Sequence, residues 1–103
     1  MRVHHLNCGT MCPRAGGAIG SGTGLGRGTM VCHCFLIETD RDGLILVDTG
    51  WGAAECADPK LLPGLFRGLV GPVLKVEETA ARQVVARGFA VADVRHVVVT
   101  HLD

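Results

Sequence analysis

The apolar run LILVD, residues 44–48, limits most strongly how this chain can fold. Consecutive apolar residues give a strand two apolar faces, which is typical of the interior of a sheet that is covered on both sides. The stretch MVCHCFLIET before it, residues 30–39, alternates and is rich in β-forming residues. Between them lies DRDG, where Asp and Gly favour a tight turn. These three stretches predict a β-hairpin whose second strand lies inside a sheet.

The rest of the chain predicts a mixed α/β layout. RVHHLN at residues 2–7 is a candidate first strand, and RHVVVT at residues 95–100 is a candidate last strand. EETAARQVVARG, residues 77–88, predicts a helix, with acids at its start and Gly88 as its C-terminal cap. Residues 53–76 contain three prolines and several glycines, so we expect an irregular excursion with one helical turn there.

Composition excludes several classes of partner. The 103 residues suffice for one small domain, and 48% hydrophobic residues can form a core. Ten basic and ten acidic residues balance to zero, which argues against nucleic acid and acidic membranes as partners. No stretch approaches the roughly 18 apolar residues of a membrane span. The five cysteines have irregular spacings and predict free thiols, so we expect a cytoplasmic protein.

The segment from residue 16 to residue 29 is half glycine. Because glycine loses much backbone entropy on ordering, we expect a mobile surface loop. Neither G-x-G-x-x-G nor the G-x-x-x-x-G-K-[ST] pattern occurs in it, and no strand-then-helix context surrounds it. The segment therefore does not predict a nucleotide site.

Two metal-capable side chains, His101 and Asp103, follow the predicted last strand. Side chains two residues apart on an extended backbone point to the same side, so both can bind one cation. Imidazole and carboxylate are zinc ligands, and a zinc-bound water has a pKa near ~7. The alternative is that a bare H-x-D pair is simply solvated, and without context that alternative is the stronger one.

Asp48 stands where the apolar strand meets a loop. It is a candidate for orienting a metal ligand, and the alternative is an Asx turn on the residues that follow it. Trp51 lies three residues later and either lines a pocket or covers the sheet edge. Cys32 and Cys34 alternate within a predicted strand, so core packing explains them better than a zinc site does.

In order and spacing, CHCFLIETDRDGLILVDTGWG, a helix, and then DVRHVVVTHLD resemble the metallo-β-lactamase superfamily of metallo-hydrolases. Within it the chain is most similar to the branch that opens N-acyl homoserine lactones. The resemblance implies a four-layer αβ/βα sandwich, of which residues 1–103 would be the N-terminal part, ending inside the metal-binding motif. It also implies one or two zinc ions and a metal-activated water that hydrolyses a lactone or another ester-type small molecule.

The resemblance assigns roles to three residues, His101, Asp103 and Asp48. His101 matches the first histidine of the family's H-x-H-x-D-H motif, which is a metal ligand. Asp103 stands where the family has the second histidine, so a carboxylate would replace an imidazole there. Asp48 matches the aspartate of D-T-G, which supports the metal-bearing loop, and Trp51 lies on the same active-site loop. With at most two ligands, the 103 residues alone are expected to be inactive.

Two other functions stay open at this point. LVDTG is also the signature of aspartic proteases, and a chain of this length suits one half of a homodimeric enzyme in which Asp48 would be catalytic. Against it, Trp51 replaces the small residue that follows D-T-G in those enzymes. The third class is a metal-free scaffold without catalysis, which the Asp103 departure favours. The sequence does not predict the oligomeric state.

Overall fold

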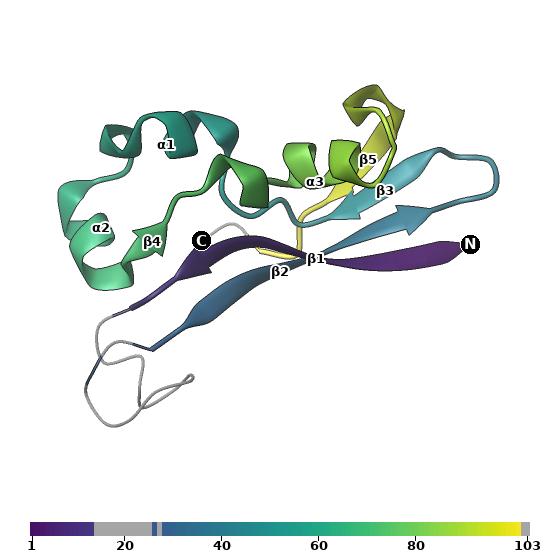
Figure 1. Ribbon diagram of the computed structural model, residues 1–103. Helices are drawn as coiled ribbons and strands as arrows, with labels where there is room; N and C mark the ends of the chain where they lie inside the picture. The colour runs from purple at the N-terminus through teal and green to yellow at the C-terminus, as the bar shows by residue number, and fades with distance from the viewer. Residues whose placement is uncertain (14–25, 27, 102–103) are drawn as a thin grey trace.

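A computed structural model describes residues 1–13, 26 and 28–101, and its centre is a five-stranded sheet. The strand order is β4-β1-β2-β3-β5, and only the pair β3–β5 is parallel (Figure 1). The strands are β1 (Arg2–Met11), β2 (Met30–Glu38), β3 (Leu44–Val47), β4 (Pro72–Val73) and β5 (Val94–Val98). The prediction of a mixed α/β fold is confirmed, and β3 lies inside the sheet as expected.

The hairpin of β2 and β3 is formed as predicted. Gly43 closes the turn with a positive φ of 73°, and its carbonyl accepts from the backbone N–H of Thr39 at 3.2 Å. The first strand is longer than predicted because the chain continues past an irregularity between Asn7 and Thr10. The Asn7 side chain accepts from the backbone N–H of Gly9 at 3.1 Å, which stabilises that irregularity.

The prediction for residues 53–76 is confirmed in its helical turn, which is present at Gly64–Val70, but the segment is more regular than the expected excursion. The segment forms α1 (Ala53–Ala57), the 3₁₀ turn η2 (Pro59–Leu61), and α2 (Gly64–Val70), followed by β4. Pro59 and Pro63 stand at helix starts instead of breaking helices, because a proline there loses no intrahelical hydrogen bond, and Pro72 opens β4. Pro59 opens η2 and Pro63 is the N-cap of α2, while Gly71 ends α2 in the left-handed conformation.

The helix predicted for residues 77–88 begins later. Residues 76–78 form the 3₁₀ turn η3 (Val76–Glu78), and α3 (Ala80–Ala86) follows. Thr79 separates them as N-cap, its hydroxyl accepting from the backbone N–H of Arg82 at 3.5 Å. The helix begins after Thr79 and not at the preceding acidic residues, because the threonine oxygen accepts a hydrogen bond from a helical N–H directly. Gly88 follows the helix with φ 88°, as predicted for its C-terminal end.

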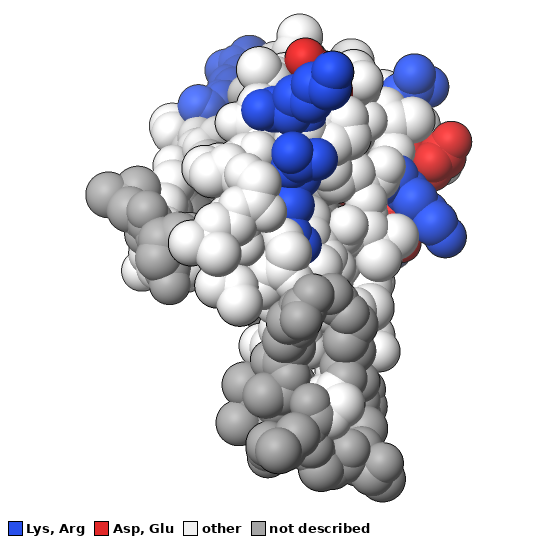
Figure 2. Space-filling model, turned by 90° about the vertical axis from the view of Figure 1, so that its left-hand side faces the viewer, with Lys and Arg blue, Asp and Glu red and all other residues white. Residues whose placement is uncertain are grey.

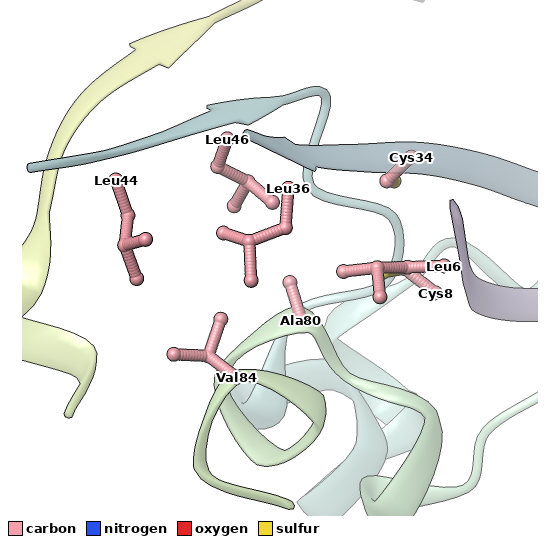
Figure 3. Close-up of a cluster of buried hydrophobic side chains, with 8 residues drawn as sticks. All are labelled: Leu6, Cys8, Cys34, Leu36, Leu44, Leu46, Ala80 and Val84. Atoms are coloured by element: carbon pink, nitrogen blue, oxygen red, sulfur yellow. The ribbon is translucent and has the colours of Figure 1, made fainter. Parts of the chain in front are cut away.

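The core lies between α3 and one face of the sheet (Figure 3). Alternate residues of the strands point toward the helix, so every second side chain is buried. The buried set is Leu6, Cys8, Cys34, Leu36, Leu44, Leu46, Ala80 and Val84. The helices lie on this face only (Figure 1), and on the other face Ile45 and Val47 stay half-buried. Within the described residues, β3 is thus covered on one side, where the sequence predicted two.

The end of the molecule that carries α1 and α2 is exposed and adds little to the core. Neither helix has a buried residue, and Leu61, Leu65 and Leu69 are exposed. Figure 2 faces this end, whose surface is mostly uncharged, with Lys and Arg side chains gathered on its upper part. Among the described helices, none has the length and apolarity to cross a membrane. The core proper is therefore confined to the sheet, α3 and the residues that flank them.

Two predictions fall wholly or mainly outside the described residues. The glycine-rich loop was placed at 16–29, of which only residues 26, 28 and 29 are described. Asp103 lies outside them as well.

Candidate metal centre

Asp48 and His101 lie close together because β3 and β5 are parallel neighbours. Both strands end at the same edge of the sheet, and Asp48 and His101 follow them there. The backbone N–H of Asp48 donates to the carbonyl of Val98 at 2.8 Å, extending the strand pairing by one step. Asp48 and His101 therefore lie next to each other at the carboxyl ends of β3 and β5, with Asp48 Oδ1 3.9 Å from His101 Nδ1.

Thr100 holds the Asp48 carboxylate with two hydrogen bonds. Its backbone N–H donates to Oδ1 at 2.9 Å and its hydroxyl donates to Oδ2 at 2.6 Å. These bonds, and then His101 nearby, hold the pKa of Asp48 below its usual range, so the group is a carboxylate at neutral pH. The partner is 52 residues away along the chain, so an Asx turn on the following residues does not account for these bonds.

His101 is linked to Asp48 through the same hydroxyl. Its Nδ1 lies 2.8 Å from Thr100 Oγ1. Because the single hydroxyl proton already goes to the Asp48 carboxylate, the hydroxyl oxygen accepts from Nδ1–H. That tautomer carries its lone pair on Nε2, which is the form in which a histidine can bind a metal ion. The hydrogen bonds from His101 to Thr100 and from Thr100 to Asp48 therefore fix the tautomer of the imidazole.

The loop after β3 is a tight turn built on two positive φ angles. In the described part of the chain, Asp48 is the one non-glycine residue with a positive φ, 61°. Gly50 has a φ of 67°. A Cβ on Gly50 would lie 2.0 Å from the carbonyl oxygen of Cys8, so only glycine fits there. Cys8 accepts from the backbone N–H of Trp51 at 3.0 Å, which fastens the loop to β1. This close approach keeps Asp48 at the end of β5.

Trp51 covers β1 and also lines an apolar hollow. Its Nε1–H donates to the carbonyl of Thr10 at 3.3 Å, and its ring lies where a Cβ of Gly9 would stand. Phe66 of α2 meets the indole edge-on, with ring centroids 6.2 Å apart. On the α3 side, Trp51 borders an apolar hollow together with Ala81 and Val97. Trp51 thus lines a pocket, one of the two roles that the sequence offered, and it packs against the inner strand β1 and not against the sheet edge.

The described residues fit part of a zinc site. His101 offers one imidazole in the ligand tautomer, which is the right chemistry for zinc. A zinc site needs at least three protein ligands, and in the described ranges no three His, Cys, Asp or Glu side chains lie close enough to hold an ion. Cys8 and Cys34 are buried in the core, as the sequence predicted for Cys34, and Cys32 is half-buried. The structure thus brings His101 and Asp48 together and places Trp51 on the adjoining loop.

Comparison with known families shows the superfamily of this chain. Residues 27–103 match the family model of the metallo-beta-lactamase superfamily. The chain belongs to that superfamily. The match begins before β2 and includes the D-T-G loop and the end of β5, the segments that form the candidate centre.

Two curated mycobacterial proteins are 48% identical to the whole chain. They are "Probable metallo-hydrolase Rv2300c" of Mycobacterium tuberculosis and "Probable metallo-hydrolase Mb2322c" of Mycobacterium bovis. The chain spans 29% of their length, so their names describe proteins much longer than these residues.

Two solved structures share the fold of this chain. A variant of B. thuringiensis AiiA with N-decanoyl-L-homoserine at its active site has a TM-score of 0.67 and 23% identity. An N-acyl homoserine lactone hydrolase with the product N-hexanoyl-L-homoserine at its catalytic metal center gives the same values. Each match covers 92% of this chain and 38% of the other. The α/β layout therefore matches the N-terminal part of the metallo-β-lactamase fold, as the sequence predicted.

One residue of the centre, Thr100, had no role of its own in the sequence analysis. Its hydroxyl lies between Asp48 and His101, and that role depends on the pairing of β3 with β5. The only signal in the sequence is that Thr100 directly precedes His101. Without the tertiary contact, nothing in the sequence connects this threonine to Asp48.

Proposed function

We propose that this protein is a zinc-dependent hydrolase that uses a metal-activated water on a lactone or another ester-type small molecule. Membership of the metallo-β-lactamase superfamily and the names of the curated relatives support metal-dependent hydrolysis. The lactone class is supported by the two structural neighbours, which hold homoserine products at their active sites. The aspartic-protease alternative is not carried forward, because the D-T-G turn belongs to the superfamily match.

The contacts of His101 are the single observation that carries this proposal. The Thr100 hydroxyl donates to the Asp48 carboxylate and accepts from Nδ1–H of His101. The lone pair of the imidazole is then on Nε2, which is the nitrogen proposed to bind the metal. Asp103 is proposed as a second ligand through a carboxylate oxygen. Zinc, when bound, supplies a water with a pKa near ~7. Asp48 keeps the ligand in place, and its charge favours a cation nearby.

Trp51 is proposed to form part of the wall of the substrate site. It follows the D-T-G turn by one residue, and Phe66 packs against its edge, so an apolar surface adjoins the loop of Asp48. Such a surface suits the hydrocarbon part of a small ester or lactone better than it suits a charged group.

The proposal is tested on the protein expressed from its complete reading frame and purified without chelator. Elemental analysis should find zinc, and a pH-stat should record acid release from N-acyl homoserine lactones that stops after chelation and returns with zinc. A protein without bound metal, and without turnover after zinc is added, would favour a scaffold that lacks catalysis. Turnover of simple aryl esters but not of lactones would support a hydrolase and exclude lactones as its substrates.

The 103 residues expressed alone should hydrolyse none of these substrates. The described residues offer one imidazole ligand, and zinc hydrolysis needs a fuller set of ligands. β5 would also be an exposed edge strand, since Val97, Val98 and Val99 are 51%, 48% and 53% exposed. Such edges favour aggregation. Zinc-dependent turnover by the soluble 103-residue chain would contradict this expectation.

Replacing Thr100 by valine should weaken zinc binding about 10–100-fold, the usual effect of removing a group that orients a metal ligand. Valine has a similar shape but cannot donate to Asp48 or accept from His101. The measurement is competition with a zinc-binding dye, with circular dichroism to check folding. Thr100→Ser keeps the hydroxyl and should retain most of the affinity. Affinity that is kept in Thr100→Val but lost in Thr100→Ser would show that the methyl group, and not the hydroxyl, matters.

A further inference from the structure

The irregularity of β1, between Asn7 and Thr10, is held at both ends by side chains from η3 and α3. At its start, Nε2–H of Gln83 donates to the carbonyl of Asn7 at 2.5 Å. At its end, the Thr10 hydroxyl donates to the Glu78 carboxylate at 3.2 Å. Gln83 also donates to the carbonyl of Glu78 at 2.8 Å, so the two holding residues are bonded to each other. The Glu78–Gln83 pair therefore fixes both ends of the irregularity relative to one helix start.

The D-T-G loop rests on the residues between those two ends. Trp51 donates from its backbone N–H to the carbonyl of Cys8 at 3.0 Å and from Nε1–H to the carbonyl of Thr10 at 3.3 Å. Gly50 lies so close to β1 that a Cβ on it would stand 2.6 Å from the Cβ of Cys8. The irregularity of β1 is therefore the surface on which the loop is placed.

An irregular stretch of strand needs support from outside the sheet. The pairing of β1 with β2 shifts between Asn7 and Thr10, and the pairing of β1 with β4 begins at Thr10. A bulge leaves its extra residue unpaired and disrupts the ladder locally. The backbone at Cys8 and Gly9 is therefore less restrained by strand pairing than its neighbours are. The side chains that hold its two ends then decide where the D-T-G loop lies.

We infer that Gln83 and Glu78 are positioning residues for the proposed metal centre, acting through β1 and the D-T-G loop. The contacts form a continuous path. The Glu78–Gln83 pair holds the irregularity of β1, and the irregularity holds the loop that begins with Asp48. Asp48 in turn accepts from Thr100, whose hydroxyl orients His101. Small errors in the placement of a site have large effects on its chemistry, so residues at the far end of such a path matter.

These contacts do not depend on what covers the opposite face of the sheet. The donor and the acceptor of every bond belong to β1, η3, α3 or the D-T-G loop. They lie on the α3 side of the sheet, where Cys8 is part of the core (Figure 3). The placement of the loop is thus independent of any metal, whereas the effect on zinc rests on the proposed function.

Hydrogen exchange followed by NMR in the metal-free protein from the complete reading frame tests the placement of the loop. Gln83→Met keeps the length of the side chain but cannot donate to Asn7. The backbone N–H of Trp51 should exchange about tenfold faster in this variant, because its acceptor on Cys8 loses support. The amides of β3 should keep their rates, which shows that the sheet stays folded. Unchanged exchange at Trp51 would overturn the inference.

Zinc affinity tests whether this placement reaches the centre. Gln83→Met should weaken zinc binding about fivefold, less than the loss of a group that is bonded directly to the ligand. In the Thr100→Val background the same change should have almost no further effect, since the link from Asp48 to His101 is already broken there. A purely structural role would weaken binding equally in both backgrounds, and that result would overturn the inference.

Two further variants serve as rescue and control. Glu78→Met removes the acceptor of the Thr10 hydroxyl and should speed exchange at Trp51, whereas Glu78→Gln keeps an oxygen acceptor and should stay within about twofold of the wild type. Arg82→Met is the matched control on α3, because Arg82 lies outside the Glu78–Gln83 pair. Equal exchange in the two Glu78 variants, or an Arg82→Met effect as large as that of Gln83→Met, would contradict the inference. Absent zinc binding with the expected exchange would count only against the proposed function.

Discussion

His101→Ala should remove the bound zinc and lower kcat/KM by at least about a hundredfold. Removal of a group that only orients a metal ligand already lowers metal affinity or activity by up to about a hundredfold, and His101 is proposed to be a ligand itself. Its Nδ1 is held by Thr100, 2.8 Å away, so the imidazole is placed before any ion arrives. Elemental analysis and lactone hydrolysis by the protein from the complete reading frame are the measurements.

His96→Ala provides the matched control for this experiment. His96 lies on β5, five residues before His101, and is likewise exposed. It should leave both the zinc content and kcat/KM within about twofold of the wild type, because exposed residues away from a site usually have small effects. If His101→Ala kept a full zinc content, the assignment of His101 as a ligand would be wrong, whatever happened to activity.

Gly50→Val should destabilise the protein by more than about 4 kcal/mol, enough to remove most of its folded population. The new Cβ would lie 2.0 Å from the carbonyl oxygen and 2.6 Å from the Cβ of Cys8. A β-branched residue also resists the positive φ of 67° that this turn requires. The loop would have to leave β1 and carry Asp48 away from Thr100. Urea unfolding followed by circular dichroism measures the loss.

Gly68→Ala is the matched control, because Gly68 lies inside α2 and a Cβ there would meet nothing within 4 Å. Alanine in a helix interior is more favourable than glycine by roughly 0.5–1 kcal/mol, so this variant should be as stable as the wild type or slightly more so. If Gly50→Val unfolded at the same urea concentration as the wild type, the close contact between the D-T-G turn and β1 would be excluded.

The strands were predictable because their signal is local. Alternation in residues 30–39 and the apolar run in residues 44–48 each specify a strand whatever surrounds them. Between β3 and α3 one helical turn was predicted, which α2 confirms, but α1 was missed because proline and glycine were interpreted as breakers. Pro59 and Pro63 instead stand at helix starts, where the missing N–H costs nothing.

By itself, the sequence predicted the candidate residues of the centre, Asp48, His101 and Asp103, because imidazole and carboxylate side chains follow the two apolar strands there. It also determined the family, through the order of D-T-G and T-H along the chain. Only the tertiary structure decided that Thr100 joins Asp48 to His101, and that η3 and α3 hold the irregularity of β1. Contacts of this kind depend on strand order and register, which arise when the whole sheet pairs and cannot be inferred from one segment alone.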